Sequence, residues 1–323
     1  MLKSLMIALL VSVTSAIGFA DEPLLRDTSF TFATIDEARS LVGTSDTYTK
    51  ALSRFDRQVR LQTDAEATEE ALLEFLKGEV LVWDEDSRKI VAESIERVRP
   101  KLKPFHVPLP RATLLIQMSG KDEGTAAYTR STAILLPKPR IQSLKPDAID
   151  RLLLHELFHV VSRNSPELRR DLYRIIGFEV CEPILLPLSL ADIKLTNPDA
   201  PLLDCTIQLT EKDDTFHAVP ILYSSSATYD TEKKPPLFKY LTFRLMKVEK
   251  HEGRWRPLLE DAEPVLITPA DCKSFTDQIG QNTKYTIHPD EILADNFVHL
   301  VLQTEKLASP QIVVKMGERL KRD

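Results

Sequence analysis

Residues 152–161 read Leu-Leu-Leu-His-Glu-Leu-Phe-His-Val-Val, and this stretch decides the fold of the chain. It contains the pattern HExxH, in which His155 and His159 are four residues apart. Residues four apart lie on one face of a helix, so both imidazoles can reach a single metal ion. Glu156 can reach a water molecule at the open position of that ion and act as general base. The stretch therefore predicts a helix that carries a metal site.

The motif helix is predicted to be buried on most sides, because apolar residues surround the motif. It begins near Pro146, which suits a first turn, and Asp147 complements the positive helix end. Ionisable groups in a buried helix are costly unless they are paired or bind a metal. The alternative interpretation is two hydrogen-bonded core histidines beside a salt-bridged glutamate.

The beginning of the chain has the features of a secretory signal peptide. A short positive start precedes an apolar run, residues 5–13, that is too short to span a membrane. Small residues at Gly18 and Ala20 predict cleavage after Ala20, with Ala16 as the second choice. We therefore expect a mature protein that begins at Asp21, is secreted or periplasmic, and has no stable membrane anchor. The alternative is an uncleaved anchor.

Composition is that of an ordinary globular protein, with 43% hydrophobic and 28% charged residues. About 300 mature residues can bury a substantial core. The net charge of −6 and the lack of a Lys/Arg block argue against a nucleic-acid partner. Three cysteines, Cys181, Cys205 and Cys272, are too few and too widely spaced for a disulfide scaffold or a zinc knuckle. One disulfide with a spare thiol is compatible with export, and its pairing is left open.

Helical patterns dominate residues 34–104, which we interpret as a packing and support unit. Residues 63–66 have the form of a capping box, which places a helix start at Thr63. Two β-prone runs follow, at 113–118 and 126–136, and predict a small sheet packed on the motif helix. The second run would either offer a free edge, to which an extended peptide adds as a strand, or lie inside the core.

A second helix and a strand-rich region follow the motif. Ser165 as N-cap and Pro166 in the first turn predict the start of the helix. Residues 180–270 are mostly strand and loop, with the best strands at 217–223 and 238–248. Such a region would supply the pocket walls that determine specificity.

A catalytic zinc requires a third protein ligand, and the chain offers two candidate regions. Glu179 lies 20 residues after His159, with Glu182 close by. Glu291 lies 132 residues after His159 and shares a helical face with Asp295, which can hold the second nitrogen of a ligating histidine. We predict Glu291 over Glu179. The alternative for Glu291 is an exposed acid that stabilises a helix start.

The two helical motifs resemble those of the gluzincin metallopeptidases. Residues 155–159 match the HExxH of that family, and 291–295, Glu-Ile-Leu-Ala-Asp, match its third-ligand pattern ExxxD or ExxxE. Residues 291–297 are especially similar to the third-ligand helix of lethal-factor-type peptidases, which reads E-x-x-A-E-x-F. The chain also resembles exported bacterial proteins that share HELFH and EILADNF.

The resemblance implies a zinc ion held by His155, His159 and Glu291, with Glu156 as the general base. These assignments agree with the role inferred above from helical spacing, in which Asp295 holds the second nitrogen of a ligating histidine.

A donor just upstream of the third-ligand helix often steadies the oxyanion in this family, and the matching residues here are Tyr285 and His288. Tyr285 could equally be a core tyrosine.

The predicted architecture is α+β, with a zincin-like catalytic domain whose small sheet packs on the HExxH helix. The predicted parts are a signal peptide at 1–20, a helical region at 21–110, and a metallopeptidase domain at 111–323 with an insertion at about 180–270. We expect a zinc-dependent peptidase that acts on peptide or protein substrates. The alternatives are a non-catalytic zinc-containing binding or structural protein, and a metallohydrolase that cleaves peptidoglycan peptide amides.

Overall fold

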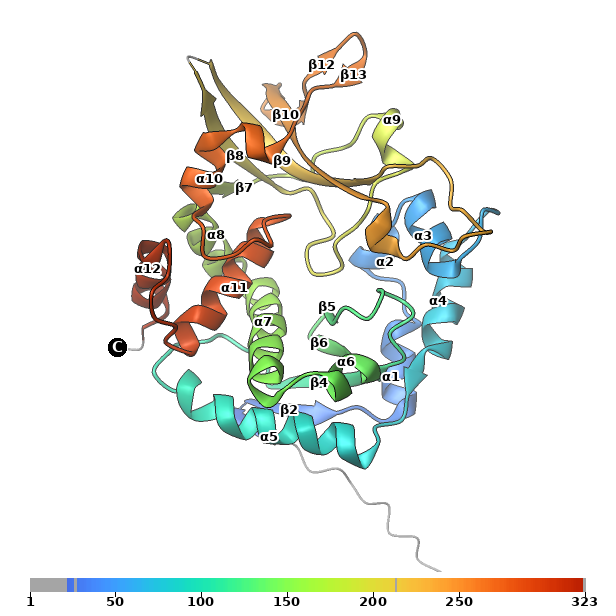
Figure 1. The fold of residues 1–323 in the computed structure, drawn as a ribbon, viewed down its shortest axis with the longest axis vertical. Helices are drawn as coiled ribbons and strands as arrows, with labels where there is room; N and C mark the ends of the chain where they lie inside the picture. The colour runs from blue at the N-terminus through green and yellow to red at the C-terminus, as the bar shows by residue number, and fades with distance from the viewer. Residues whose placement is uncertain (1–21, 26–27, 213, 322–323) are drawn as a thin grey trace, which may run out of the picture.

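The computed structural model of the protein describes residues 22–25, 28–212 and 214–321 (Figure 1). The predicted signal peptide and its cleavage sites lie outside these residues. Within the described ranges no helix has the length and apolar character needed to cross a membrane. The chain is α+β, as predicted. Its α-helices are α1 (Ile35–Val42), α2 (Thr47–Ala51), α3 (Arg54–Leu61), α4 (Glu69–Gly78), α5 (Glu85–Leu102), α6 (Lys138–Ser143), α7 (Pro146–Asn164), α8 (Pro166–Ile175), α9 (Leu188–Ala191), α10 (Lys273–Ile279), α11 (Pro289–Val301) and α12 (Pro310–Leu320).

The first sheet has the strand order β1-β2-β4-β6-β5, and β3 also pairs with β4. Its strands are β1 (Glu22–Leu25), β2 (Thr28–Phe32), β3 (Val80–Leu81), β4 (Ala112–Met118), β5 (Tyr128–Arg130) and β6 (Ala133–Pro137). β2, β4 and β6 are parallel, whereas β5 runs antiparallel to β6 at the end of the order. The run predicted as one strand at 126–136 is therefore a hairpin, and Ser131, with φ of 52°, reverses the chain.

Both faces of this sheet are covered, which explains why its strands read as continuous apolar runs. Successive residues of a strand point to opposite faces. Ile134 and Leu136 of β6 join a large core with α5 and α7. Leu135 and Met118 join a second core with α1 and α4. The sheet is thus the middle layer between two groups of helices.

The predicted domain boundary at residue 110 passes through this sheet. β2 comes from the region predicted to be helical, yet it pairs in parallel with β4, from Ser29 opposite Ala112 to Phe32 opposite Leu115. A strand of five residues that lies just before the helical pattern of residues 34–104 is too short to be recognised from its periodicity. Residues 22–110 therefore contribute strands and core to the part that carries the motif.

The start of α4 also differs from the prediction. Thr68 caps this helix, because its hydroxyl accepts a hydrogen bond from the N–H of Ala71 at 3.2 Å. The Thr63 hydroxyl instead accepts from the N–H of Ala65 at 3.1 Å, within the preceding loop. The capping pattern lay five residues too early, although most of residues 34–104 is helical as expected.

The region predicted to be strand and loop builds a second, antiparallel sheet with the order β11-β10-β9-β8-β7, and β14 also pairs with β10. The strands of this region are β7 (Phe178–Val180), β8 (Cys205–Glu211), β9 (Asp214–Ser224), β10 (Leu241–His251), β11 (Arg254–Pro257), β12 (Leu259–Glu260), β13 (Glu263–Pro264) and β14 (Leu266–Ile267). The predicted strand at 217–223 lies within β9. The one predicted at 238–248 begins only at Leu241, because residues 237–239 form a short 3-10 turn. Cys181, Cys205 and Cys272, all in the described part of the chain, are free thiols.

α7 lies at the centre of the molecule, with α11 on one side and the β5–β6 hairpin on the other (Figure 1). It begins at Pro146 and is buried on most sides, as predicted from its apolar residues. α8 follows directly, with Ser165 as its N-cap residue and Pro166 in its first turn. The fold therefore sets the HExxH helix between the first sheet and the helix that carries Glu291.

Candidate metal centre

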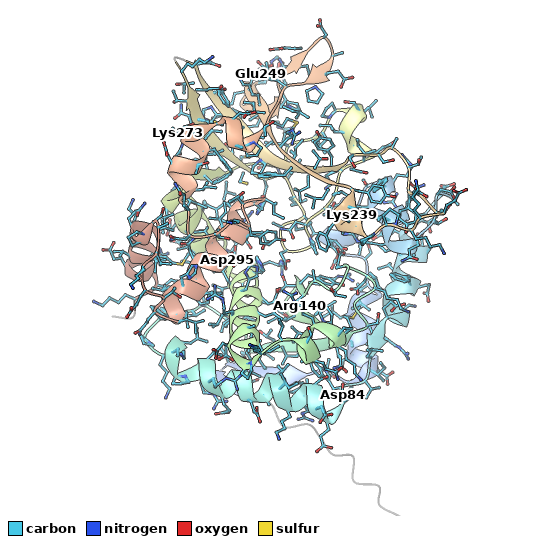
Figure 2. All side chains as sticks on the ribbon, in the orientation of Figure 1. Asp84, Arg140, Lys239, Glu249, Lys273 and Asp295 are labelled. Carbon is cyan, nitrogen blue, oxygen red and sulfur yellow. The ribbon has the colours of Figure 1, made fainter. Side chains whose placement is uncertain are left out.

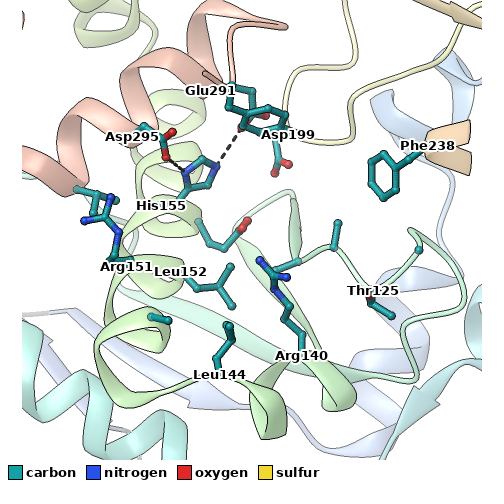
Figure 3. Close-up of a pocket in the computed structure, with 17 residues that line it drawn as sticks. Thr125, Arg140, Leu144, Arg151, Leu152, His155, Asp199, Phe238, Glu291 and Asp295 are labelled. Carbon is teal, nitrogen blue, oxygen red and sulfur yellow. Dashed lines mark hydrogen bonds and ion pairs between the residues drawn. The ribbon is translucent and has the colours of Figure 1, made fainter. Parts of the chain in front are cut away.

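Two helices bring the three predicted ligands together. His155 and His159 lie one turn apart on α7, and both lie against Glu291 in the first turn of α11. Figure 3 shows His155 beside Glu291. The Nε2 atoms of His155 and His159 lie 3.0 Å and 3.5 Å from Oε2 of Glu291. Ligand atoms of the three residues all lie within 4.8 Å of one another. This buried group could hold a metal ion.

A carboxylate holds the second nitrogen of each histidine. Nδ1 of His155 is 3.0 Å from Oδ1 of Asp295, and Nδ1 of His159 is 2.7 Å from Oδ2 of Asp290. Such contacts fix the tautomer and the orientation of a ligating imidazole. Because both Nδ1 atoms are engaged, both Nε2 atoms are presented to Glu291. Asp295 thus lies where the sequence predicted it.

Asp290 was missed by the sequence analysis. Its carboxylate is buried and accepts hydrogen bonds from the hydroxyls of Ser162, at 2.6 Å, and Tyr173, at 3.0 Å. The available signal was its position beside Glu291 in a first turn, where the helix dipole favours any acidic residue. Which helix lies against Asp290 depends on the packing of α11 on α7.

Two buried atoms at this centre have no hydrogen-bond partner among the described residues, namely Nε2 of His159 and Oε2 of Glu156. Leaving such atoms without partners is costly in a protein interior. A cation beside His159 would use the lone pair of Nε2, and a water molecule on that cation could bond to Glu156. The residues therefore fit a divalent metal ion.

The pKa values of the residues at the centre also fit a bound metal ion. Burial would lower the pKa of His155, but hydrogen bonds to Asp295 and Glu291 outweigh it and raise the pKa to about 10. Burial also opposes the charged form of Glu291, yet the positive charge of His159 and the contacts to both histidines hold its pKa well below its usual value. Protons on the imidazoles thus compensate the carboxylates, and a bound metal ion would replace those protons.

Glu156 lies at the same centre and is only 3% exposed. Burial, followed by the negative charge of Asp199, raises its pKa to about 8. A carboxyl group whose pKa lies near neutrality is suited to accept and return a proton.

The centre opens into a cleft of about 530 Å³ (Figure 3). The cleft lies between α7, α6, α11 and the segment before β5. Figure 2 places Arg140 and Asp295, two of its lining residues, towards the middle of the molecule. The lining comprises Gly124, Thr125, Ala126, Ala127, Arg140, Leu144, Ala148, Arg151, Leu152, His155, Glu156, Asp199, Phe238, Tyr285, Glu291, Asp295 and Val298.

The structure separates the two residues predicted as oxyanion donors. Tyr285 lines the cleft, and its ring lies 6.3 Å from that of His155, centroid to centroid. The charge of Glu291 raises the pKa of Tyr285, so its phenol keeps a proton to donate. His288 is buried away from the cleft, where its Nδ1 accepts from the N–H of Asp290 at 3.1 Å and caps α11. Burial lowers the pKa of His288 to about 4.

The other candidate for the third ligand is remote from the histidines. Glu179 lies on β7, its side chain is 68% exposed, and its nearest charged partner is Arg174 at 3.7 Å. Glu182 lines a separate groove beside the second sheet. Of the glutamates weighed from the sequence, Glu291 alone is brought to His155 and His159.

Two further residues reach the centre from the loop between α9 and β8. Asn197 Nδ2 donates to Oε1 of Glu291 at 2.6 Å. Asp199 has a carboxylate oxygen within 4.8 Å of ligand atoms of Glu156 and His159. No local pattern in the sequence connects these loop residues to the motif, because only the tertiary fold brings the loop over α7.

Comparison of the chain with protein-family models, with curated proteins and with solved structures finds no match.

Proposed function

We propose that the protein is a zinc-dependent metallopeptidase of the gluzincin type. The observation that carries this proposal is the meeting of the unpartnered His159 Nε2 and Glu156 Oε2 beside Glu291, at the inner end of an open cleft. Two imidazoles and one carboxylate form the donor set of many catalytic zinc sites, in which one position stays open. A purely structural site has no need of a neighbouring base.

The proposed mechanism gives each residue at the centre a separate chemical role. His155, His159 and Glu291 would hold zinc, which lowers the pKa of a water molecule and polarises a carbonyl group when bound. Glu156 accepts the proton of the attacking water and returns it to the leaving amine. Tyr285 donates its phenolic hydrogen to the developing oxyanion.

The residues that line the cleft favour a peptide or protein as the substrate. Residues 124–127 line it, and they lead directly into β5, the strand at the end of the first sheet. An extended peptide can add to such an edge through main-chain hydrogen bonds, which would lay it across the metal centre.

The decisive test is Glu156→Gln, which keeps the shape of the side chain and removes the base. We expect turnover of a broad peptide panel to fall by about 10²–10⁴-fold, the usual contribution of general base catalysis. Zinc content should remain unchanged. Glu179→Gln makes the same chemical change on β7, outside the cleft, and should leave turnover as in the wild type. If wild type and Glu156→Gln are equally inert over the panel while both bind zinc, the protein is a non-catalytic metal protein.

We also propose that the protein acts outside the cytoplasm after removal of residues 1–20. The support is the charged start, the apolar run and the small residues before Asp21. Intact-mass measurement of protein recovered outside the cytoplasm should give a chain that begins at Asp21, and a retained Met1 would contradict this.

A further inference from the structure

The loop between α9 and β8, residues 193–204, crosses the metal centre and is tied to several elements. The Thr196 hydroxyl donates to Asp56 of α3 at 2.7 Å. Arg163 of α7 donates to the main-chain carbonyl of Asp199 at 3.0 Å. Asn197 reaches Glu291 of α11, as described above. These contacts place one carboxylate of the loop, that of Asp199, at the centre (Figure 3).

One oxygen of Asp199 occupies the edge of the first sheet. Its Oδ1 accepts hydrogen bonds from both the main-chain N–H and the hydroxyl of Thr129, each at 2.7 Å. Thr129 lies in β5, and its N–H is directed away from β6, towards the side of β5 that pairs with no described strand and is covered by Asp199 and Arg163. A peptide that adds to β5 would need the same N–H. The carboxylate therefore takes the place of a substrate carbonyl.

The same carboxylate borders the space that a metal ion would fill. A carboxylate oxygen of Asp199 lies within 4.8 Å of ligand atoms of both Glu156 and His159. Both hydrogen bonds to Thr129 use Oδ1, which leaves Oδ2 for a cation. The unpartnered atoms of Glu156 and His159 belong to this same cluster. The carboxylates of buried Glu156 and half-buried Asp199 repel one another unless a proton or a cation lies between them.

We propose that Asp199 is a displaceable fourth ligand of the metal ion, and that the loop of residues 193–204 is a latch that closes the site to peptides. One carboxylate would block both the open coordination position and the β5 edge. Opening would replace the Asp199 carboxylate on the ion by a water molecule and would break the two hydrogen bonds to Thr129, with no covalent bond made or broken. This inference rests on the metal centre of the proposed function and adds its regulation.

The test replaces Asp199 by asparagine, because the amide oxygen can still accept from Thr129 whereas the uncharged amide is a poor metal ligand. We expect zinc affinity to fall about 10-fold or more, in the range that loss of a supporting carboxylate already reaches. In the Co²⁺-loaded protein, followed by visible absorption, acetohydroxamate should bind the variant at least about 10-fold more tightly than the wild type, because a position has opened. Asp192→Asn, at the exposed end of α9, is the matched control and should change neither quantity.

Thr129→Val supplies a second route, since it keeps the carboxylate and removes one of its two hydrogen bonds. It should tighten acetohydroxamate binding a few-fold, less than Asp199→Asn does. Unchanged acetohydroxamate binding in both folded variants would overturn the latch. So would a lower metal affinity without any spectral change, because charge alone would explain it.

Peptide hydrolysis separates this inference from the proposed function. If Asp199→Asn opens the coordination position and also raises hydrolysis, both stand. If the position opens while neither protein cleaves any peptide, the latch stands and the peptidase does not.

Discussion

Two histidine-containing clusters lie near the start of α11, and they differ in how their polar atoms are satisfied. In the first cluster, His155, His159 and Glu291 meet Glu156 at the inner end of a cleft. Nε2 of His159 and Oε2 of Glu156 lack partners among the described residues.

In the second cluster, ligand atoms of Asp204, Cys205 and His288 also lie within 4.8 Å of one another. Arg169, however, binds both oxygens of Asp204, at 2.7 Å and 2.9 Å. His288 uses Nδ1 to cap α11 and places Nε2 3.9 Å from the Cys205 sulfur. A guanidinium already occupies the place where a cation would neutralise the carboxylate.

The comparison shows that metal-ligand side chains lying close together do not by themselves make a metal centre. Atoms left unsatisfied in a buried place, and access from solvent, distinguish the first cluster from the second.

Glu291→Ala should abolish high-affinity zinc binding. We expect a loss of more than about 100-fold, because removal of a supporting residue alone costs about 10–100-fold. Glu179→Ala should retain zinc, and so should His288→Asn, which changes the second cluster while keeping a good helix cap. Metal analysis and zinc titration of the purified proteins, with circular dichroism as a check of folding, give the answer. Zinc lost from Glu179→Ala but retained by Glu291→Ala would show that the assignment is wrong.

Tyr285→Phe should lower turnover by about 100-fold or more with zinc affinity unchanged, since it removes one oxyanion donor. His288→Asn should leave turnover close to that of the wild type, because His288 is buried away from the cleft. Steady-state kinetics on a cleaved peptide measure both. Full activity of Tyr285→Phe would show that main-chain or other donors suffice.

Asp295→Asn should weaken zinc binding by about 10–100-fold, because it loosens the hold on Nδ1 of His155. Asp204→Asn removes a half-buried carboxylate from the second cluster and should leave zinc affinity unchanged, although it disturbs the pair with Arg169. Competition with a chelator measures affinity, and thermal unfolding separates it from stability. An equal loss in the two variants would contradict the contrast between the clusters.

The metal-free protein should become less stable as pH rises from 6 to 9. The pKa of His155 is raised from 6.5 to about 10 in the fold, so its contribution is fully present below pH 6.5 and is lost as pH rises towards 10. The pKa of Glu156 is raised from 4.5 to about 8, which also favours the protonated fold and acts in the same direction. Each pKa unit corresponds to about 1.4 kcal/mol, so we expect the free energy of unfolding to fall by at least about 1 kcal/mol between pH 6 and pH 9.

Urea unfolding with a chelator at pH 6 and pH 9 measures this loss. His155→Asn should reduce the pH dependence of the free energy of unfolding. If other groups that titrate near pH 9 caused it, the variant would keep the full dependence. A metal-free protein that is equally stable at both values would contradict the ionisation argument.

Helical spacing accounts for the parts of the site that could be predicted. His155 with His159, and Glu291 with Asp295, are each four residues apart, and a helix places such pairs on one face whatever packs against it. The cap at Ser165 was equally local.

Predictions failed where a local pattern had competitors. Residues 63–66 match a capping box, but the helix starts at the cap Thr68 because tertiary packing selects among nearby helix starts. The five residues of β2 carry too little periodicity to stand out, and they become a strand because β4 offers them hydrogen bonds.

Local sequence alone was enough to predict the helix of residues 146–164, with His155 and His159 on one of its faces. It was also enough to predict that Glu291 and Asp295 share a face of a second helix. These features depend on the 3.6-residue period of the helix, which acts over a few residues. Tertiary packing, in contrast, determines that Glu291 rather than Glu179 contacts His155 and His159. It also determines that Asp199 lies beside both His159 and Thr129 of β5. Those contacts join residues between about 40 and 136 positions apart in the sequence. The hydrophobic effect that brings such segments together is non-directional, so no local pattern records which segments will meet.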